Sequence, residues 1–161
     1  ICSHIMKGKP TAVQATGIAH TQNGLENIAY LTLRYGEDRI AHFNCSWSSP
    51  VKVRHMLIGG DKKMIVFNDL EATEKIKVYD TGYSVKSDED KEQIMVDYRV
   101  GDIHVPKIAT KEALGGMAKD FFDAITKGIT PLSDADLGLE VVAILEAAQI
   151  SIKNGGKEVL L

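Results

Sequence analysis

The sequence has few cysteines and no long apolar run, and each shortage excludes a class of protein. Its only cysteines, Cys2 and Cys45, lie far apart and belong to no CxxC motif. We therefore expect two reduced thiols, as in a cytoplasmic protein, rather than a disulfide or a metal site. No stretch approaches the roughly 20 apolar residues that a membrane-spanning helix needs. We also expect no signal peptide, because the opening ICSHIMKGKP lacks a charged segment followed by an apolar one.

Neither sign of charge dominates. The chain has 19 Lys and Arg against 22 Asp and Glu, for a net charge of −3. Because Lys and Arg are not in excess, we expect no nucleic-acid partner. Because no apolar segment is long enough to cross a membrane, we expect no membrane partner. The apolar content of 44% and charged content of 25% are those of an ordinary globular protein. A length of 161 residues suffices for one core, so we expect a single domain over residues 1–161.

Alternating apolar and polar residues predict an antiparallel meander in the first two thirds of the chain. The opening residues 1–6 have helical spacing, and Gly8 and Pro10 are expected to end that helix. Glycine-rich turns separate the runs that follow, as at Gly36. The predicted strands are residues 12–19, 28–35, 40–47, 51–58, 64–67, 75–79 and 94–100.

The last third changes to helical periodicity. One helix is predicted from an N-cap at Thr110 to Gly128, and a second from an N-cap at Ser133 to Asn154. The glycines at 115 and 116 indicate a close approach to the sheet. Both apolar stripes are expected to be buried against that sheet. The sequence therefore predicts an α+β fold, an open and mainly antiparallel sheet with helices packed on one face.

One strand carries the candidate binding residues. Between Pro50 and Gly59, alternation places Lys52 and Arg54 on one face, close to Trp47, the only tryptophan. Two cations and an aromatic ring on a sheet suit a flat, anionic or polyhydroxylated ligand. The alternative is a solvated strand face with long side chains.

The residues predict no chemistry by themselves. There is no glycine-rich phosphate loop, no HExxH, no nucleophile elbow and no acid–base carboxylate pair. His42 and Asn44 lack the spacing of a metal site, and nothing nearby in the sequence orients His4 as a catalytic base, so structural roles are expected for all three. Read from its residues alone, the chain is an α+β domain.

Three stretches nevertheless resemble a known family in their order and spacing: SHIMKGKPTAVQATG, LTLRYGEDRIAHFNCSW and DFFDAITKGITPLSDADLGLEVVAILEAAQISIKNGGKEVLL. Over essentially the whole chain they are similar to the C-terminal domain of the Gfo/Idh/MocA oxidoreductases, which resembles that of glyceraldehyde-3-phosphate dehydrogenase. The segments SWSSPVKVRHMLIGGDKKMIVFNDLEATEKIKVYD and YRVGDIHVPKIATKEAL look most like members acting on nucleotide-activated sugars or sugar acids.

The resemblance implies that this chain is part of a longer NAD- or NADP-dependent dehydrogenase. The family's N-terminal Rossmann domain and its EKP-like lysine motif are absent here, and its catalytic Asp and His would precede Ile1. We therefore expect no catalytic, cofactor-binding or metal-binding residue, and an inactive fragment. The resemblance also implies two roles for the open sheet. It joins the subunits of a homo-oligomer, and it lines the substrate-binding site with Trp47, Lys52, Arg54 and Arg99. The alternative is a non-catalytic binding or oligomerisation module with the same fold.

Overall fold

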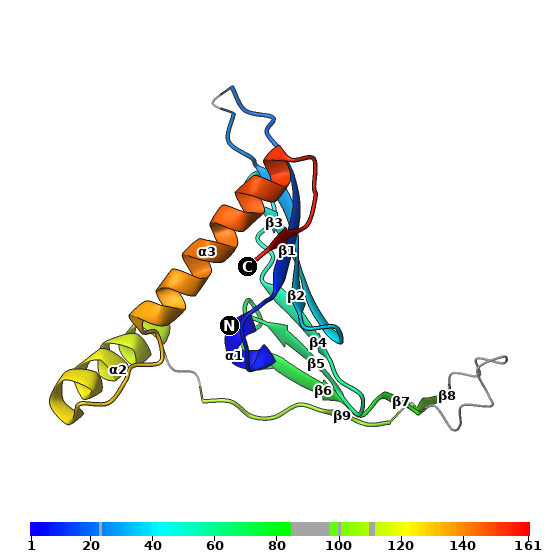
Figure 1. Ribbon diagram of the computed structural model, residues 1–161. Helices are drawn as coiled ribbons and strands as arrows, with labels where there is room; N and C mark the ends of the chain where they lie inside the picture. The colour runs from blue at the N-terminus through cyan, green and yellow to red at the C-terminus, as the bar shows by residue number, and fades with distance from the viewer. Residues whose placement is uncertain (23, 85–96, 100, 110–111) are drawn as a thin grey trace. The chain divides into compact units, whose positions relative to one another are not determined.

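The computed structural model describes residues 1–22, 24–84, 97–99, 101–109 and 112–161 (Figure 1). Antiparallel sheets and helices make up these residues, without a closed barrel, which confirms the predicted α+β class. The elements are α1 (Cys2–Met6), β1 (Ala12–Ile18), β2 (Ile28–Tyr35), β3 (Arg39–Ser46), β4 (His55–Gly59), β5 (Met64–Asn68), β6 (Ile76–Tyr79), β7 (Gly82–Ser84), β8 (Asp97–Arg99), β9 (Ile103–His104), α2 (Ala113–Lys127), α3 (Ala135–Lys153) and β10 (Val159–Leu160).

The chain forms two compact units where the sequence predicted one domain. Unit 1 combines Ile1–Pro50 with Ala113–Leu161, and unit 2 is Val51–Glu112. The predicted single sheet is correspondingly divided into two four-stranded sheets, one in each unit, and the two-stranded ribbon β7–β8.

The sheet of unit 1 has the strand order β10-β1-β2-β3, and every pair is antiparallel. The register aligns Ala15 with Leu31 and Leu31 with Phe43, so the apolar positions of three strands share one face. The other face carries exposed apolar side chains among polar neighbours: Ile18, Tyr30, Ile40 and Leu160. Unit 1 thus has a covered face and an open face.

The C-terminal part of helix α3 packs on the apolar face of this sheet along β1 (Figure 1). Val141 and Leu145 of its apolar stripe are exposed, so the prediction that the sheet buries this stripe was only partly correct. Val13 and Ala15 of β1 form a buried core with Ala147 and Ala148 of α3. Small helix residues let the helix backbone approach the strand closely. The N-cap is Asp134, whose carboxylate accepts a hydrogen bond from the Leu137 N–H at 2.8 Å. The prediction of Ser133 as the cap was therefore wrong by one residue.

A buried serine joins α3 to the sheet. The two-residue strand β10 pairs only with Ala12 and Val13, so the next inward N–H of β1, that of Ala15, has no strand partner on that side. The Ser151 hydroxyl oxygen accepts this hydrogen bond at 2.9 Å and donates its own to the Lys157 carbonyl at 2.6 Å. The side chain thereby satisfies the buried N–H of Ala15 and a part-buried carbonyl group.

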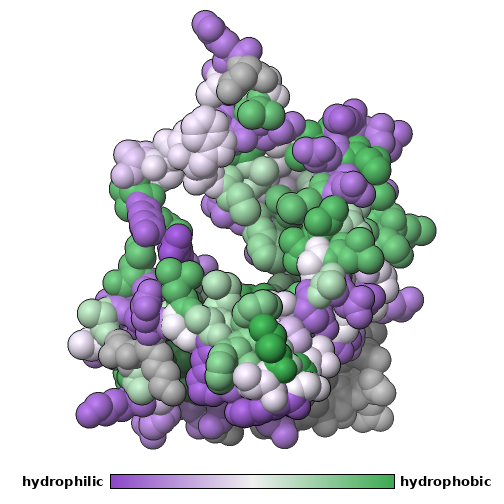
Figure 2. Space-filling model, turned by 90° about the vertical axis from the view of Figure 1, so that its left-hand side faces the viewer, coloured by the Kyte–Doolittle hydropathy of each residue, from purple (hydrophilic) through white to green (hydrophobic). Residues whose placement is uncertain are grey.

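The apolar stripe of α2 is exposed, and the prediction that the sheet buries it was wrong. Leu114, Met117, Phe121, Phe122 and Ile125 are each between 63% and 68% exposed. The view from the side of α2 shows hydrophobic atoms at this surface (Figure 2). A Cβ added at Gly116 would meet no described atom within 4 Å, so at this glycine the expected close approach to the sheet is absent. The helix ends as predicted at Gly128, whose φ is +64°; the predicted cap Thr110 lies outside the described residues.

Unit 2 is built on a four-stranded antiparallel sheet with the order β4-β5-β6-β9. One face is entirely apolar on the three longer strands, carrying Met56, Ile58, Ile65, Phe67, Ile76 and Val78. The opposite face is mixed, with Leu57, Met64 and Val66 among polar side chains, and it holds the candidate site. Since residues 51–54 form no strand, the predicted strand 51–58 is correct only from His55 onward.

Most of the predicted strand at 94–100 lies outside the described residues, which include only its part in β8. None of the helices in the described ranges has the length and apolar character needed to cross a membrane.

Candidate functional site

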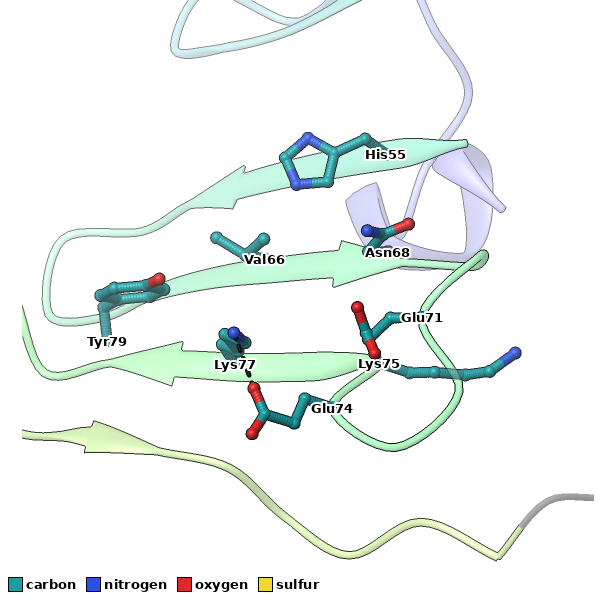
Figure 3. A pocket seen from close by; sticks show the side chains of 8 residues that line it. All are labelled: His55, Val66, Asn68, Glu71, Glu74, Lys75, Lys77 and Tyr79. Carbon is teal, nitrogen blue, oxygen red and sulfur yellow. Dashed lines mark ion pairs between the residues drawn. The ribbon is translucent and has the colours of Figure 1, made fainter. Parts of the chain in front are cut away.

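A hollow of about 170 Å³ opens on the polar face of the unit 2 sheet (Figure 3). Three neighbouring strands and the loop between β5 and β6 supply the side chains around it: His55, Val66, Asn68, Glu71, Glu74, Lys75, Lys77 and Tyr79. Ligand pockets for drug-sized molecules usually measure about 300–1,000 Å³. This hollow therefore has room for a single small ring or a charged group, but not for a whole nucleotide.

Strand register brings these side chains together. His55 pairs with Asn68, and Val66 pairs with Lys77 on the next strand. Within β6 and the residue before it, period-two alternation places Lys75, Lys77 and Tyr79 on one face. In Figure 3, Val66 forms an apolar floor between the polar side chains of its neighbours.

The loop after β5 is held by its own hydrogen bonds. The Asn68 side-chain oxygen accepts from the Leu70 N–H at 3.1 Å, and the Asn68 carbonyl accepts from the Glu71 N–H at 3.3 Å. This turn is local, because Asn side chains readily bond the backbone two residues ahead. It positions Glu71 beside the hollow and leaves the Asn68 NH₂ group available to donate.

Two cations hold Asp69, which is the next residue of this loop. Arg54 Nη1 lies 3.3 Å from one carboxylate oxygen and Lys75 Nζ 3.5 Å from the other; Lys75 also donates to the Asp69 carbonyl at 3.1 Å. The hydrogen bond from Arg54, followed by that from Lys75, lowers the pKa of the Asp69 carboxyl. In Figure 3, Lys75 extends along the loop and away from the hollow. Arg54 and Lys75 are thus positioned to fix the loop.

A second ion pair lies beside the hollow itself. Lys77 Nζ is 2.8 Å from a Glu74 carboxylate oxygen, the contact drawn dashed in Figure 3. The hydrogen bond lowers the pKa of Glu74 and raises that of Lys77, so both groups are charged at neutral pH. In the part of the chain that the structure describes, no ion pair engages Glu71 or His55.

This arrangement suits binding rather than covalent chemistry. Donors and acceptors alternate around an apolar floor, and the charged side chains nearly cancel. Among the described residues no group of three His, Cys, Asp or Glu side chains is arranged to hold a metal ion. The site can form hydrogen bonds with several hydroxyl groups of one small molecule.

The four residues predicted from the sequence are not shown to form one site. Trp47 lies in unit 1, one residue past β3, where its indole N–H donates to the Glu26 carbonyl at 2.9 Å. Lys52 and Arg54 belong to unit 2 but precede β4, so the predicted strand face carrying both was wrong. The first residue of this segment that pairs with β5 is His55, which lies opposite Asn68. Arg99 ends β8, and its side chain lies outside what the structure describes.

Sequence reasoning missed Lys75, Lys77 and Tyr79, although the necessary signal is present. The run KIKVY has two cations two residues apart, followed by an aromatic residue, in a strand. That is the pattern the sequence analysis sought at Lys52 and Arg54. The run KIKVY pairs with β5 along its length. Lys52 and Arg54, in contrast, precede the first residue of β4.

A comparison with protein-family models matches the first part of the chain. Residues 1–66 match the family model described as the GFO/IDH/MocA C-terminal domain. No match was found among curated proteins.

Solved structures extend the similarity over nearly the whole chain. UDP-N-acetylglucosamine 3-dehydrogenase GnnA from Acidithiobacillus ferrooxidans has 16% identity and a TM-score of 0.70, over 92% of this chain and 42% of that one. An oxidoreductase from Agrobacterium radiobacter, in complex with NAD⁺, L-tartaric acid and magnesium, has 14% identity and a TM-score of 0.64, over 98% and 45%. The WlbA dehydrogenase from Bordetella pertussis, in complex with NADH and UDP-GlcNAcA, has 15% identity and a TM-score of 0.54, over 99% and 43%.

The chain spans less than half the length of these three proteins, and at such identities the similarity shows the fold. The resemblance noted in the sequence is confirmed: the chain resembles the Gfo/Idh/MocA C-terminal domain, in sequence over residues 1–66 and in fold over nearly its full length.

Proposed function

We propose that this chain is the substrate-binding and oligomerisation domain of an NAD- or NADP-dependent oxidoreductase that acts on a sugar or nucleotide-activated sugar. The observation that carries the proposal is the fold, which is similar to parts of dehydrogenases about twice as long, two of them named for or solved with UDP-sugars. The polar hollow of unit 2 supports it, because its side chains are suited to hydroxyl groups.

The described residues do not fit a nicotinamide dinucleotide. Such cofactors bind where parallel strands meet the N-terminus of a helix through a glycine-rich turn. Every strand pair in the described ranges is antiparallel, and neither glycine of α2 follows a strand directly. In the proposal, a separate Rossmann domain of the parent protein holds the cofactor, and this chain contributes the substrate side.

The proposed assembly uses the open face of the unit 1 sheet. Tyr30 is 45% exposed there and Ile40 66%. Tyr30 stacks on His42 with ring centroids 6.3 Å apart. A face with exposed apolar side chains among polar ones is typical of a surface that a second subunit covers.

The proposal is tested with the parent protein that contains this chain. Purified parent is mixed with NAD⁺ or NADP⁺ and a panel of UDP-sugars, free sugars and sugar acids, and reduced nicotinamide is followed by absorbance. We expect reduction with at least one sugar substrate. A folded parent that reduces neither cofactor with any member of the panel would contradict an oxidoreductase function and favour a non-catalytic module.

A further inference from the structure

The open face of unit 1 carries a histidine among its exposed apolar side chains. His42 lies in the middle of β3, directly opposite Thr32 of β2. Its ring stacks on Tyr30 with centroids 6.3 Å apart, and its Nδ1 atom lies 3.1 Å from the Thr32 hydroxyl oxygen. Ile40, two residues before it, faces the same side and is 66% exposed. These contacts place the imidazole on the surface that is proposed to join subunits.

The charges on this face disfavour a protonated His42. Arg34 of β2 lies on the same face, and the only carboxylate that pairs with it in the described structure is Glu158, at 3.4 Å. The turn between β2 and β3 carries Glu37 and Asp38, and Asp38 pairs with the arginine that follows it. The other described side chains of this face on β1, β2 and β3 bear no charge at neutral pH: Gln14, Thr16, Ile18, Ile28, Tyr30, Thr32, Ile40, Asn44 and Ser46. An imidazolium here would therefore share the face with a cation, and these strands offer it no carboxylate.

A second subunit on this face would remove His42 from water. Histidine is the side chain whose charge ordinarily changes between about pH 5 and pH 8. A neutral imidazole keeps its hydrogen bond with Thr32 under a partner, whereas an imidazolium loses its hydration without gaining a carboxylate. A two-fold contact also brings the same groups from the partner subunit to the interface. The stacking on Tyr30 exists in the free subunit too, so it does not offset this cost.

From these observations we infer that His42 makes assembly through this face sensitive to pH. The subunits associate when the imidazole is neutral and separate when it is protonated, because the assembled form binds protons less well than the free form. The inference rests on the assembly in the proposed function, to which it adds a means of regulation. It is independent of the hollow in unit 2 and of the reaction of the parent protein.

The test is sedimentation equilibrium of the 161-residue chain at about pH 8 and about pH 5.5. Far-UV circular dichroism at each pH confirms that the chain is folded. We expect the dissociation constant of the oligomer to rise about tenfold or more at the lower pH. A difference of one pH unit in proton binding between free and assembled subunits corresponds to a factor of about ten.

Two variants at the same position separate charge from shape. His42→Gln cannot be protonated and should assemble equally well at both pH values. His42→Lys is charged at both and should weaken assembly about tenfold already at the higher pH. His104→Gln removes a histidine from β9 of unit 2, so it should keep the pH response of the unaltered chain.

The outcomes distinguish the inference from the proposed assembly. An oligomer with the same dissociation constant at both pH values would overturn the role of His42 and leave assembly in place. So would a pH response that persists unchanged in His42→Gln. A folded chain that is monomeric at both pH values and at every concentration would overturn the inference and the proposed assembly together.

Discussion

Arg54 and Asp69 are joined twice, by an ion pair at 3.3 Å between guanidinium and carboxylate and by a hydrogen bond at 3.0 Å from the Asp69 N–H to the Arg54 carbonyl. The backbone bond lies just beyond the first β4–β5 pair, His55 with Asn68. The residue that the sequence singled out for ligand binding is thus also the residue that ties the loop beside the hollow to the sheet.

If the parent protein acts on a sugar that carries a phosphate or carboxylate, Arg54→Ala should raise the KM for that substrate about tenfold while kcat stays nearly unchanged. Charge-assisted hydrogen bonds from a guanidinium group to an anionic substrate are worth roughly 1.5–3 kcal/mol. One nitrogen of the Arg54 guanidinium, Nη1, already pairs with Asp69. Steady-state kinetics and oligomer size are measured on the same preparation. Arg54→Lys should recover only part of the loss, since an ammonium lacks the fork. An unchanged KM with a dissociated oligomer would instead place Arg54 at a subunit interface.

The Asp69 carboxyl should titrate below the ordinary aspartate pKa of about 3.9, because Arg54 and Lys75 lower its pKa in the folded chain. Its contribution to stability is then fully present above about pH 4 and is lost as the pH falls through the lower, folded-state pKa. Side-chain carboxyl shifts recorded between neutral and acidic pH measure the midpoint. Arg54→Ala should move the midpoint upward, and Arg39→Ala should not. An identical midpoint in all three proteins would argue against the ion pair.

Ser151→Ala should lower the free energy of unfolding by about 1–3 kcal/mol. The substitution leaves the buried N–H of Ala15 and the carbonyl of Lys157 without their partner. Denaturant unfolding followed by far-UV circular dichroism gives the difference. Ser46→Ala, which removes an exposed hydroxyl at the end of β3, is the matched control and should change stability by less than about 0.5 kcal/mol. Equal effects of the two variants would contradict a structural role for the Ser151 hydroxyl.

If the open face of unit 1 is an oligomer interface, Tyr30→Asp should give a species near 17.6 kDa where the unaltered chain gives a larger one. A carboxylate in the centre of an apolar contact is desolvated without a partner, which costs several kcal/mol. Light scattering at increasing concentration measures the mass. Leu132→Asp changes an equally apolar but more exposed residue between α2 and α3, and should leave the mass unchanged. A monomeric unaltered chain at all concentrations would refute assembly.

The isolated chain should bind neither NAD nor NADP. Its described strand pairs are antiparallel and offer no parallel strand–turn–helix unit for the pyrophosphate. Isothermal titration calorimetry with each cofactor in excess should show no heat beyond dilution. A micromolar dissociation constant for either cofactor would show that this chain itself carries a dinucleotide site.

The sequence by itself determined the elements whose signals are local. Strand β2 occupies Ile28–Tyr35, as the alternation predicted, because side chains that alternate about a pleat need one buried face. The end of α3 also follows from local chemistry, since Gly155 and Gly156 adopt positive φ values of 70° and 83° that most residues avoid. The α+β class follows from the order of these patterns.

Only the tertiary structure decided which of those segments pair with another strand or pack against the sheet. Lys52 and Arg54 alternate as strand residues do, but pairing with β5 begins at His55, so no ladder sets their faces. The stripe of α2 has the periodicity of a buried helix, yet Phe121 and Phe122 are exposed in the described structure. The hollow depends on the register that pairs His55 with Asn68 and Val66 with Lys77 across three strands. Periodicity describes one segment at a time, whereas register and burial are properties of pairs of segments distant in sequence.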